Sequence, residues 1–291
     1  MVDALATPGG WQAELTSIAH EQELAEIDPP YLGFCVPARD LRELRVARGK
    51  LVSSLRKSAD GIVAKLLNRR ISLPITRLIA NTPIHPNQVT LIALACALAG
   101  GAVISRGGYL AGIVGMLLVE LGSIVDGIDG ELARLRFQFS RKGQWLDTVV
   151  DDLGNIAYTS GVTVSLDLAG VSWAVPVGLA AVGAFVLTQA TQYYLILRVY
   201  RSGDLAAIPW AFQSSEFLSQ NPRGILRRIA ATIPKLLKRD FVVSMFVVFA
   251  AIDRLELVLG VFCGGAFLFF AVLFTQLVRN RESIARAAAI P

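Results

Sequence analysis

The sequence predicts an all-α, polytopic membrane protein with six transmembrane helices and an N-terminal cytoplasmic helical extension. Its 291 residues are 54% hydrophobic and only 18% charged, whereas soluble domains are about 45–50% apolar and about 25% charged. From Pro86 onward the chain contains long apolar runs, each near the ~20 residues that span a hydrocarbon core of ~30 Å. Basic residues gather on one side of these runs, as in membrane proteins that follow the positive-inside rule.

Residues 1–58 are predicted to form a cytoplasmic N-terminal extension of unknown role, and 59–87 a juxtamembrane amphipathic helix. Apolar residues recur every three or four positions from Asp40 to Leu67, with a break near Asp60 and Gly61, which is the pattern of an amphipathic helix. A second amphipathic stretch covers 71–84. It could lie along the membrane surface or pack on a soluble neighbour, and the periodicity leaves both open.

Residues 88–291 are predicted to form the six-helix membrane domain. The spans are expected at about 88–105, 109–127, 145–168, 172–197, 241–256 and 258–278. Basic residues follow the second, fourth and sixth spans, while the opposite side holds only Arg106 and Arg254. Because positive residues mark the cytoplasmic side, both termini and the adjoining site are expected to face the cytoplasm, with the protein integral to the inner (cell) membrane.

Acidic residues concentrate where the second span ends and the third begins. They are Asp126, Asp129, Glu131, Asp147, Asp151 and Asp152. Charged side chains at membrane depth are unfavourable and mark functional sites by default. The cluster is therefore the candidate site of the protein.

The spacing of these residues places most of them on two helical stripes. Asp126, Asp129, Gly130, Ala133 and Arg134 stand at offsets 0, 3, 4, 7 and 8, which is one face of a helix. Asp147 and Asp151 follow Gly143 at offsets 4 and 8 on the next helix. Two antiparallel helices joined by a short loop can turn these stripes toward each other, so that four carboxylates converge.

Four clustered carboxylates repel one another unless cations neutralise them. Three scattered cysteines and two histidines exclude a disulfide framework and leave little room for a His-ligated metal. Hard oxygen ligands suit Mg²⁺ or Mn²⁺, and two such cations ~3.5–4 Å apart would clamp a phosphoryl displacement. Arg134 offers a planar fork for phosphate oxygens. The alternative is that the small residues only allow close helix packing and that Arg134 forms a structural ion pair.

Together these positions form the pattern Asp126-x2-Asp129-Gly130-x2-Ala133-Arg134-x8-Gly143-x3-Asp147-x3-Asp151. It resembles the signature of the CDP-alcohol phosphotransferase family at every fixed position. The resemblance implies six membrane helices, two divalent cations, and a CDP moiety bound at the cytoplasmic face. It also implies the activity: a substituted phosphate moves from a CDP-linked donor to an acceptor hydroxyl, and CMP is released.

By position, the resemblance assigns roles to the site residues. Asp126, Asp129 and Asp147 would be metal ligands, and Asp151 a ligand or neighbour of the metal and the general base. The residues that line the CDP site would be Gly130, Ala133, Arg134 and Gly143.

Two weaker resemblances concern the segment before the first span. Pro86-Asn87-Gln88-Val89-Thr90 is similar to a stretch that opens this span in many family members, where the Asn lies near the nucleotide. The alternative is that Asn87 only caps the helix. Residues 60–90 also resemble the branch that makes di-myo-inositol-phosphate-phosphate from CDP-inositol.

Arg198 and Arg239 are the candidates for binding the acceptor, because family members that accept a phosphorylated polyol place arginines at this depth. The alternative is that these residues contact anionic lipid. The expected partners are a CDP-linked donor, an alcohol or polyol-phosphate acceptor, the lipid bilayer and a second copy of the chain in a homodimer, with no nucleic acid.

The predicted function is transfer from CDP-diacylglycerol or CDP-inositol in phospholipid or phospho-polyol biosynthesis. A rival within the same chemistry is a phosphatidylglycerophosphate or phosphatidylinositol-phosphate synthase that uses CDP-diacylglycerol. A rival of another class is a divalent-cation transporter that binds its ion at the intramembrane aspartates. A transporter favours acids spread through the membrane depth, whereas here they cluster at one face.

Overall fold

The computed structural model describes residues 40–55, 61, 63–138, 140–200 and 238–279. These residues form helices and turns without strands, which confirms the all-α prediction. The chain divides into one unit up to Ser54 and a second from Leu55 onward. Within the first unit the described part is one helix, α2 (Leu41–Ser54), whose N-terminus is capped by Asp40 Oδ1, which accepts from the backbone N–H groups of Arg42 and Glu43.

The second unit begins with a short helical segment that precedes the apolar helices. The π-helical turn η2 (Ala64–Asn68) continues directly into α3 (Arg69–Ile79). After a loop come α4 (Pro86–Ile104), α5 (Tyr109–Leu135), α6 (Arg141–Leu168) and α7 (Ala174–Leu195), which ends in the π turn η3 (Ile196–Tyr200). The last two helices are α10 (Arg239–Ala251) and α11 (Leu255–Arg279).

Four of the described helices are long and apolar enough to cross a membrane: α4, α5, α7 with its η3 extension, and α11. α6 has 28 residues, but it carries acidic and basic side chains along its first half. α10 has 13 residues, about 20 Å at the helical rise per residue, which is shorter than the ~30 Å hydrocarbon core. The membrane assignment is supported, while the count of six spans stays a prediction.

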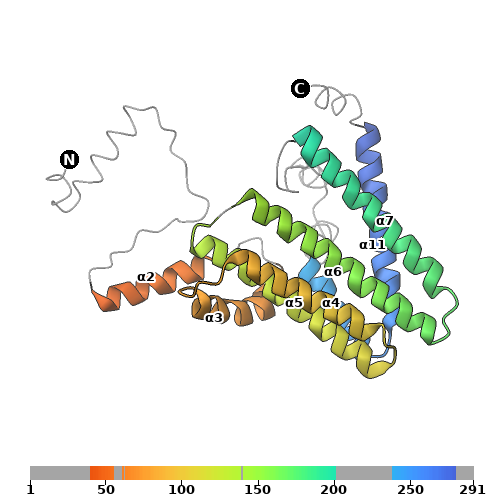
Figure 1. Cartoon of the computed structure of the whole chain (residues 1–291), viewed down its shortest axis with the longest axis horizontal. Helices are drawn as coiled ribbons and strands as arrows, with labels where there is room; N and C mark the ends of the chain where they lie inside the picture. Colours follow the sequence, from red (N-terminus) through yellow and green to blue (C-terminus); the bar gives the residue numbers. More distant parts are fainter. Residues whose placement is uncertain (1–39, 56–60, 62, 139, 201–237, 280–291) are drawn as a thin grey trace, which may run out of the picture. The chain divides into compact units, whose positions relative to one another are not determined.

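Close packing joins α4 to both α5 and α6 (Figure 1). A Cβ added to Gly101 of α4 would lie 2.5 Å from the Ala157 carbonyl oxygen of α6, and one added to Gly100 would lie 2.7 Å from the Gly115 carbonyl oxygen of α5. Small residues therefore allow the three backbones to approach each other. The turn between α4 and α5 is made by Gly107 and Gly108, both with positive φ, a conformation that glycine adopts without strain.

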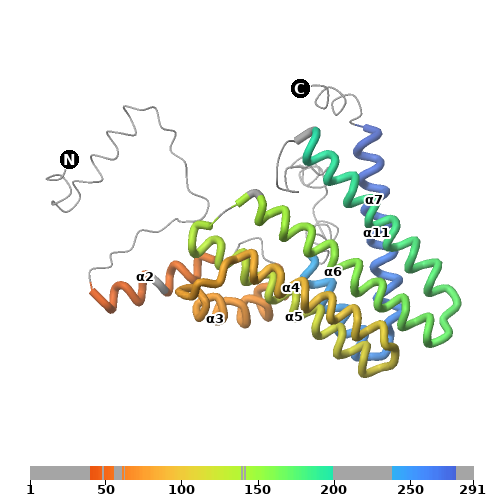
Figure 2. The backbone as a smooth tube through the Cα atoms, in the orientation of Figure 1, coloured from red at the N-terminus to blue at the C-terminus, as the bar shows by residue number. Residues whose placement is uncertain are grey.

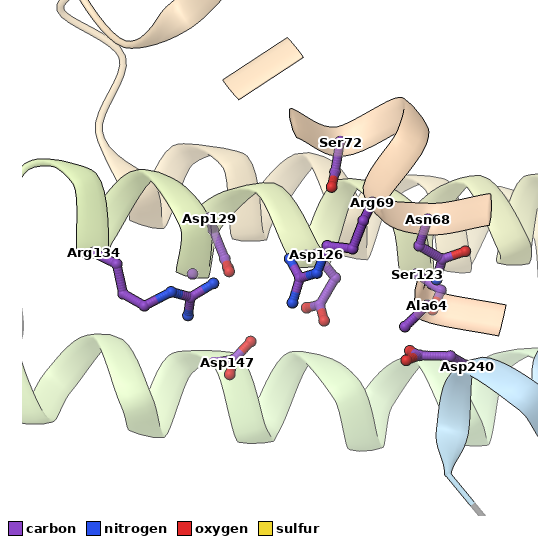
Figure 3. A pocket seen from close by; sticks show the side chains of 12 residues that line it. Ala64, Asn68, Arg69, Ser72, Ser123, Asp126, Asp129, Arg134, Asp147 and Asp240 are labelled. Atoms are coloured by element: carbon purple, nitrogen blue, oxygen red, sulfur yellow. The ribbon is translucent and has the colours of Figure 1, made fainter. Parts of the chain in front are cut away.

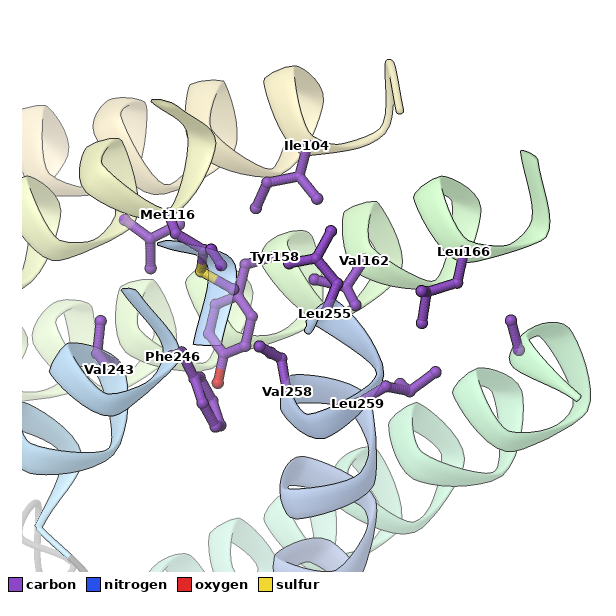
Figure 4. Close-up of a cluster of buried hydrophobic side chains, with 13 residues drawn as sticks. Ile104, Met116, Tyr158, Val162, Leu166, Val243, Phe246, Leu255, Val258 and Leu259 are labelled. Carbon is purple, nitrogen blue, oxygen red and sulfur yellow. The ribbon is translucent and has the colours of Figure 1, made fainter. Parts of the chain in front are cut away.

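The backbone path brings the start of α4, the end of α5 and the start of α6 to one end of this group (Figure 2). The start of α10 joins them, because its first residue pairs with side chains of α5 and α6. At the other end, α5, α6, α10 and α11 enclose an apolar cluster in which Tyr158 packs edge-on against Phe246 with 5.9 Å between ring centroids (Figure 4). One end of the group is thus apolar, and the polar candidate site lies at the other.

Candidate active site

Three aspartates of the predicted signature converge between α5 and α6. Asp126 and Asp129 project from α5 and Asp147 from α6, and one carboxylate oxygen of each lies within 4.8 Å of the others. Figure 3 shows the three side chains directed into the space between the two helices. The helical stripes that the spacing predicted therefore do face each other.

A side chain of α4 orients the buried Asp129. The hydroxyl of Thr90 donates a hydrogen bond to Asp129 Oδ2, and Thr90 is itself buried. This residue is the last of the Pro86 to Thr90 stretch, in which the family resemblance predicts a site role for Asn87 alone. The signal was present in the motif, but only the fold shows which aspartate the threonine contacts.

Arg239 lies between the fourth signature aspartate and the first. Its Nη1 donates to Asp151 Oδ1 and stands 3.6 Å from Asp126 Oδ2. Asp151 is accordingly ion-paired and is not one of the three carboxylates grouped above. The predicted acceptor residue Arg239 is thus placed at the acidic cluster, whereas Arg198 lies exposed in η3 and does not line the cavity described below.

The residues predicted to line the CDP site fall into two places. Gly130 leaves room for Arg134, because a Cβ there would lie 3.2 Å from Arg134 Nη1. At Gly143 a Cβ would lie 3.2 Å from Asn87 Oδ1 and 2.9 Å from Ser140 Oγ. The glycine therefore allows the start of α6 to approach Asn87 closely.

The helix cap is a different residue from the one considered. α4 begins at Pro86 with His85 as its N-cap, so the alternative that Asn87 caps the helix is wrong. Asn87 stands in the first turn and is exposed. Ala133 and Gly143 do not line the cavity that holds the aspartates.

That cavity has a volume of about 190 Å³ and is lined by the juxtamembrane segment and by α5, α6 and α10. Its lining residues are Ala64, Asn68, Arg69, Ser72, Ser123, Asp126, Gly127, Asp129, Gly130, Arg134, Asp147 and Asp240. Residues of η2 and α3 form one wall. The place of this segment at the site is not predictable from its sequence, because the periodicity of 71–84 fits both a membrane surface and a protein neighbour.

A buried carboxylate fastens α3 against α5. Glu131 is fully buried and accepts hydrogen bonds from Arg69, from Ser72 at 2.5 Å and from Thr76 at 2.5 Å. Buried charges require such partners. Glu131 therefore fixes the wall of the cavity that α3 supplies.

Arg136, just beyond α5, fastens the end of α3. Its guanidinium donates to the backbone carbonyls of Ile79, Ala80, Thr82 and Ile84 at 2.5–3.0 Å. Carbonyls at a helix C-terminus lack intrahelical partners, and a cation there is favourable. Arg136 is one of the basic residues that follow the second predicted span, and these contacts give it a structural role.

The site residues fit a divalent cation. The donor set consists of carboxylate oxygens, which suit Mg²⁺ or Mn²⁺. Asp126 Oδ1 is buried and has no hydrogen-bond partner among the described residues. A buried carboxylate oxygen in that state calls for a cation or a donor from a ligand.

The fold and the site define a helical membrane protein with a cavity lined by clustered carboxylates. Residues 83–220 match the family model described as CDP-alcohol phosphatidyltransferase. This segment contains the complete signature from Asp126 to Asp151, so the resemblance to the family is confirmed over it.

The chain is also similar to several named proteins. The chain is 34% identical over 151 residues to the "Bifunctional IPC transferase and DIPP synthase" of Rubrobacter xylanophilus, covering 52% of this chain and 33% of the relative. It is 36% identical over 110 residues to the protein of the same name from Archaeoglobus fulgidus, covering 38% and 21%. A further similarity, 30% over 99 residues, is to the "Archaetidylinositol phosphate synthase" of Pyrococcus horikoshii, covering 33% of this chain and 50% of the relative. The matched part is a third or less of the two bifunctional relatives.

Proposed function

We propose that this protein transfers a substituted phosphate from a CDP-linked alcohol to an acceptor hydroxyl and releases CMP. The observation that carries the proposal is the convergence of Asp126, Asp129 and Asp147, with oxygens within 4.8 Å of one another, inside the segment that matches the transferase family. Asp151 lies one helical turn beyond Asp147 on the same stripe. A site for phosphoryl transfer needs this concentration of hard ligands and a proton acceptor.

In this proposal Asp126, Asp129 and Asp147 hold two divalent cations, Mg²⁺ or Mn²⁺, with Asp151 as a further ligand or neighbour. When bound, the cations would supply the positive charge that neutralises the donor diphosphate. The acceptor hydroxyl oxygen forms a bond to the donor phosphorus distal to the cytidine. Asp151 accepts the hydroxyl proton, and the bond from that phosphorus to the bridging oxygen breaks, so that CMP leaves with the electron pair.

The remaining signature residues are proposed to bind the donor. Arg134 lines the cavity beside Gly130, where its planar guanidinium can pair with phosphate oxygens. Asn87 and Gly143 approach each other at the start of α4 and α6, and with Ala133 they are proposed to contact the CDP moiety. The guanidinium of Arg239 is proposed to bind the phosphate of a phosphorylated acceptor, because it lies beside Asp126 and Asp151. Arg198 lacks a comparable position.

The names of the relatives favour a donor or acceptor that contains inositol. Four of them are named bifunctional IPC transferase and DIPP synthase, and a fifth is named archaetidylinositol phosphate synthase. CDP-inositol and CDP-diacylglycerol are therefore the two donors to compare. We further propose that the protein acts as a homodimer in the inner membrane, with the site and both termini on the cytoplasmic side.

The test is CMP release by the full chain purified in detergent, with radiolabelled CDP-inositol or CDP-diacylglycerol and Mg²⁺. Product analysis with inositol phosphate and glycerol phosphate as acceptors identifies the branch. A phosphatidylglycerophosphate or phosphatidylinositol-phosphate product from CDP-diacylglycerol would select the rival synthase. Wild-type activity that persists in Asp126→Asn would refute the proposal, and metal flux in proteoliposomes without CMP release would favour the transporter.

A further inference from the structure

The cavity has two chemically different ends. Figure 3 shows Arg134 at one end and Asn68, Ser123 and Asp240 at the other, with the grouped aspartates between them. A guanidinium suits phosphate oxygens. The opposite end presents the amide of Asn68, the hydroxyl of Ser123 and the carboxylate of Asp240, groups that form hydrogen bonds with hydroxyls.

At this second end, Asn68 is the buried residue whose side chain has a polar atom unpartnered in the part of the chain that the structure describes. The residue is 6% exposed, it lines the cavity, and its Oδ1 has no hydrogen-bond partner among the described residues. Buried polar groups in folded proteins nearly always have a partner. An Oδ1 atom in this state is a preformed acceptor for an O–H or N–H group of a ligand.

The backbone around Asn68 is also unusual. Asn68 ends the π-helical turn η2, and α3 follows without a break. Single π turns occur frequently at functional sites because they redirect one side chain. The next residue, Arg69, is anchored by the buried Glu131, so that the position of Asn68 at the cavity wall is fixed by its neighbour.

The reacting group of the proposed mechanism is near this end. Asp240 is adjacent in the chain to Arg239, whose guanidinium contacts both Asp151 and Asp126. Asp151, the proposed base, is therefore held close to the start of α10, the helix that also supplies Asp240. The helix that pairs with Asp151 therefore also lines the end of the cavity where Asn68 lies.

From this asymmetry we infer that Asn68, Ser123 and Asp240 form the subsite for the hydroxyl groups of a polyol acceptor. Asn68 is its specificity-determining residue, with Oδ1 accepting a hydrogen bond from a hydroxyl that is not transferred. The inference rests on the proposed function. The CDP-linked donor correspondingly occupies the Arg134 end.

Ligand-dependent thermal stabilisation of the full chain in detergent tests this assignment without turnover. The probes are CDP with Mg²⁺, myo-inositol, myo-inositol 1-phosphate and glycerol 3-phosphate. In Asn68→Leu we expect the half-saturating concentration of the inositol probes to rise about 10-fold, the loss of one hydrogen bond, while that of CDP stays within about 2-fold. In Arg134→Gln we expect the half-saturating concentration of CDP to rise about 10-fold and that of the inositol probes to stay within about 2-fold.

The matched control is Asn81→Ala, since Asn81 is exposed, lies beyond α3 and does not line the cavity. If Asn68→Leu does not fold, Asn68→Ala is used in its place. Stabilisation by myo-inositol alone assigns the contact to the ring hydroxyls, and stabilisation only by the phosphorylated probes, unchanged in Asn68→Leu, overturns the assignment. A shift in CDP binding by Asn68→Leu also overturns it, because Asn68 would then contact the nucleotide.

CMP release by the wild type, measured on the same preparation, separates the two claims. If no CMP is released but the inositol probes bind in a manner that depends on Asn68, the transferase proposal fails and the subsite stands. If CMP is released but Asn68→Leu leaves the KM of every acceptor unchanged, the subsite is refuted and the transferase proposal stands.

Discussion

At the residue scale, the site depends on contacts that orient the carboxylates as much as on the carboxylates themselves. Thr90 holds Asp129 from α4, and Arg239 holds Asp151 from α10. Partners of this kind fix the rotamers of metal ligands. Helices α5 and α6 carry the aspartates, and side chains from α4 and α10 orient the carboxylate oxygens of Asp129 and Asp151.

Replacing Thr90 by Val should weaken metal binding. The variant keeps the side-chain shape but leaves Asp129 without the hydrogen bond, and loss of such an outer contact typically lowers metal affinity 10- to 100-fold, so we expect about 10-fold. Mn²⁺ binding to the full chain, followed by electron paramagnetic resonance, measures the change. Thr191→Val is the matched control, because Thr191 donates only to the Leu187 carbonyl of its own helix. Equal affinity in the Thr90 variant and the wild type would contradict the assigned role.

Replacing Asp151 by Asn should separate proton transfer from metal binding. We expect CMP release to fall about 10²- to 10⁴-fold, the usual contribution of a general base. Mn²⁺ binding should persist, because the three grouped carboxylates do not include Asp151. Loss of Mn²⁺ binding together with activity would instead identify Asp151 as an essential ligand.

The aspartates were predictable because helical spacing alone places Asp126 and Asp129 on one face, and Asp147 and Asp151 on another. Arg239 was predicted at the site only as an acceptor-binding residue. Its contact with Asp151 and that of Thr90 with Asp129 were not predictable, because the partners are 88 and 39 residues apart. Spacing within one helix carries no information about such separations.

At the scale of elements, α3 is a fixed part of the site. Glu131 binds three side chains of α3, and Arg136 binds the carbonyls where that helix ends. The two contacts lie on either side of Arg134, which lines the same cavity. The wall that α3 supplies and the end of the cavity at Arg134 are therefore both attached to the last turns of α5.

Glu131→Gln should destabilise the protein without removing any proposed catalytic group. It leaves Arg69 buried without its counter-ion, and breaking a buried ion pair in this way usually lowers stability by about 3–5 kcal/mol. Thermal unfolding of the full chain in detergent gives the change. Glu256→Gln, at the first turn of α11, is the control for loss of one negative charge. A melting temperature equal to that of the control would show that the Glu131 network contributes little.

Helix positions followed from the apolar runs, and α4, α5 and α7 begin or end within a few residues of the predicted spans. The boundary between the last two helices differed from the predicted one at 256–258, because Ile252 to Arg254 form a turn that contains the charged Asp253 and Arg254. Asp253 adopts a positive φ there, a local conformation that hydrophobic periodicity does not encode.

At the scale of the whole molecule, polarity is divided between the two ends of the helix group. The aspartates, Arg134, Arg136 and Arg239 lie at one end, and the apolar cluster around Phe246 lies toward the other. Large apolar side chains remain exposed along the helices, among them Leu110, Leu179 and Phe274. Such surfaces are expected where helices face lipid.

The predicted topology can be tested with single cysteines. After replacement of Cys35, Cys96 and Cys263, Arg106→Cys in the turn between α4 and α5 should react with an impermeant maleimide from outside the cell. Gln138→Cys, between α5 and α6, should react only after permeabilisation. The opposite pattern of labelling would place the acidic site outside the cytoplasm.

The family resemblance and the helical class were predictable, because the signature and the composition are properties of the linear chain, and residues 83–220 match the family model. The division of the cavity into two ends was not, since it depends on how η2, α3 and α10 meet α5 and α6.

The central claim is that the grouped aspartates bind divalent cations and support transfer from a CDP-linked donor. Its most direct test is CMP release by metal-depleted full chain titrated with Mg²⁺ or Mn²⁺, for the wild type and for Asp126→Asn. We expect no CMP release without cations, saturable recovery in the wild type and no recovery in Asp126→Asn. Release by metal-depleted protein, or equal recovery in Asp126→Asn, would contradict it.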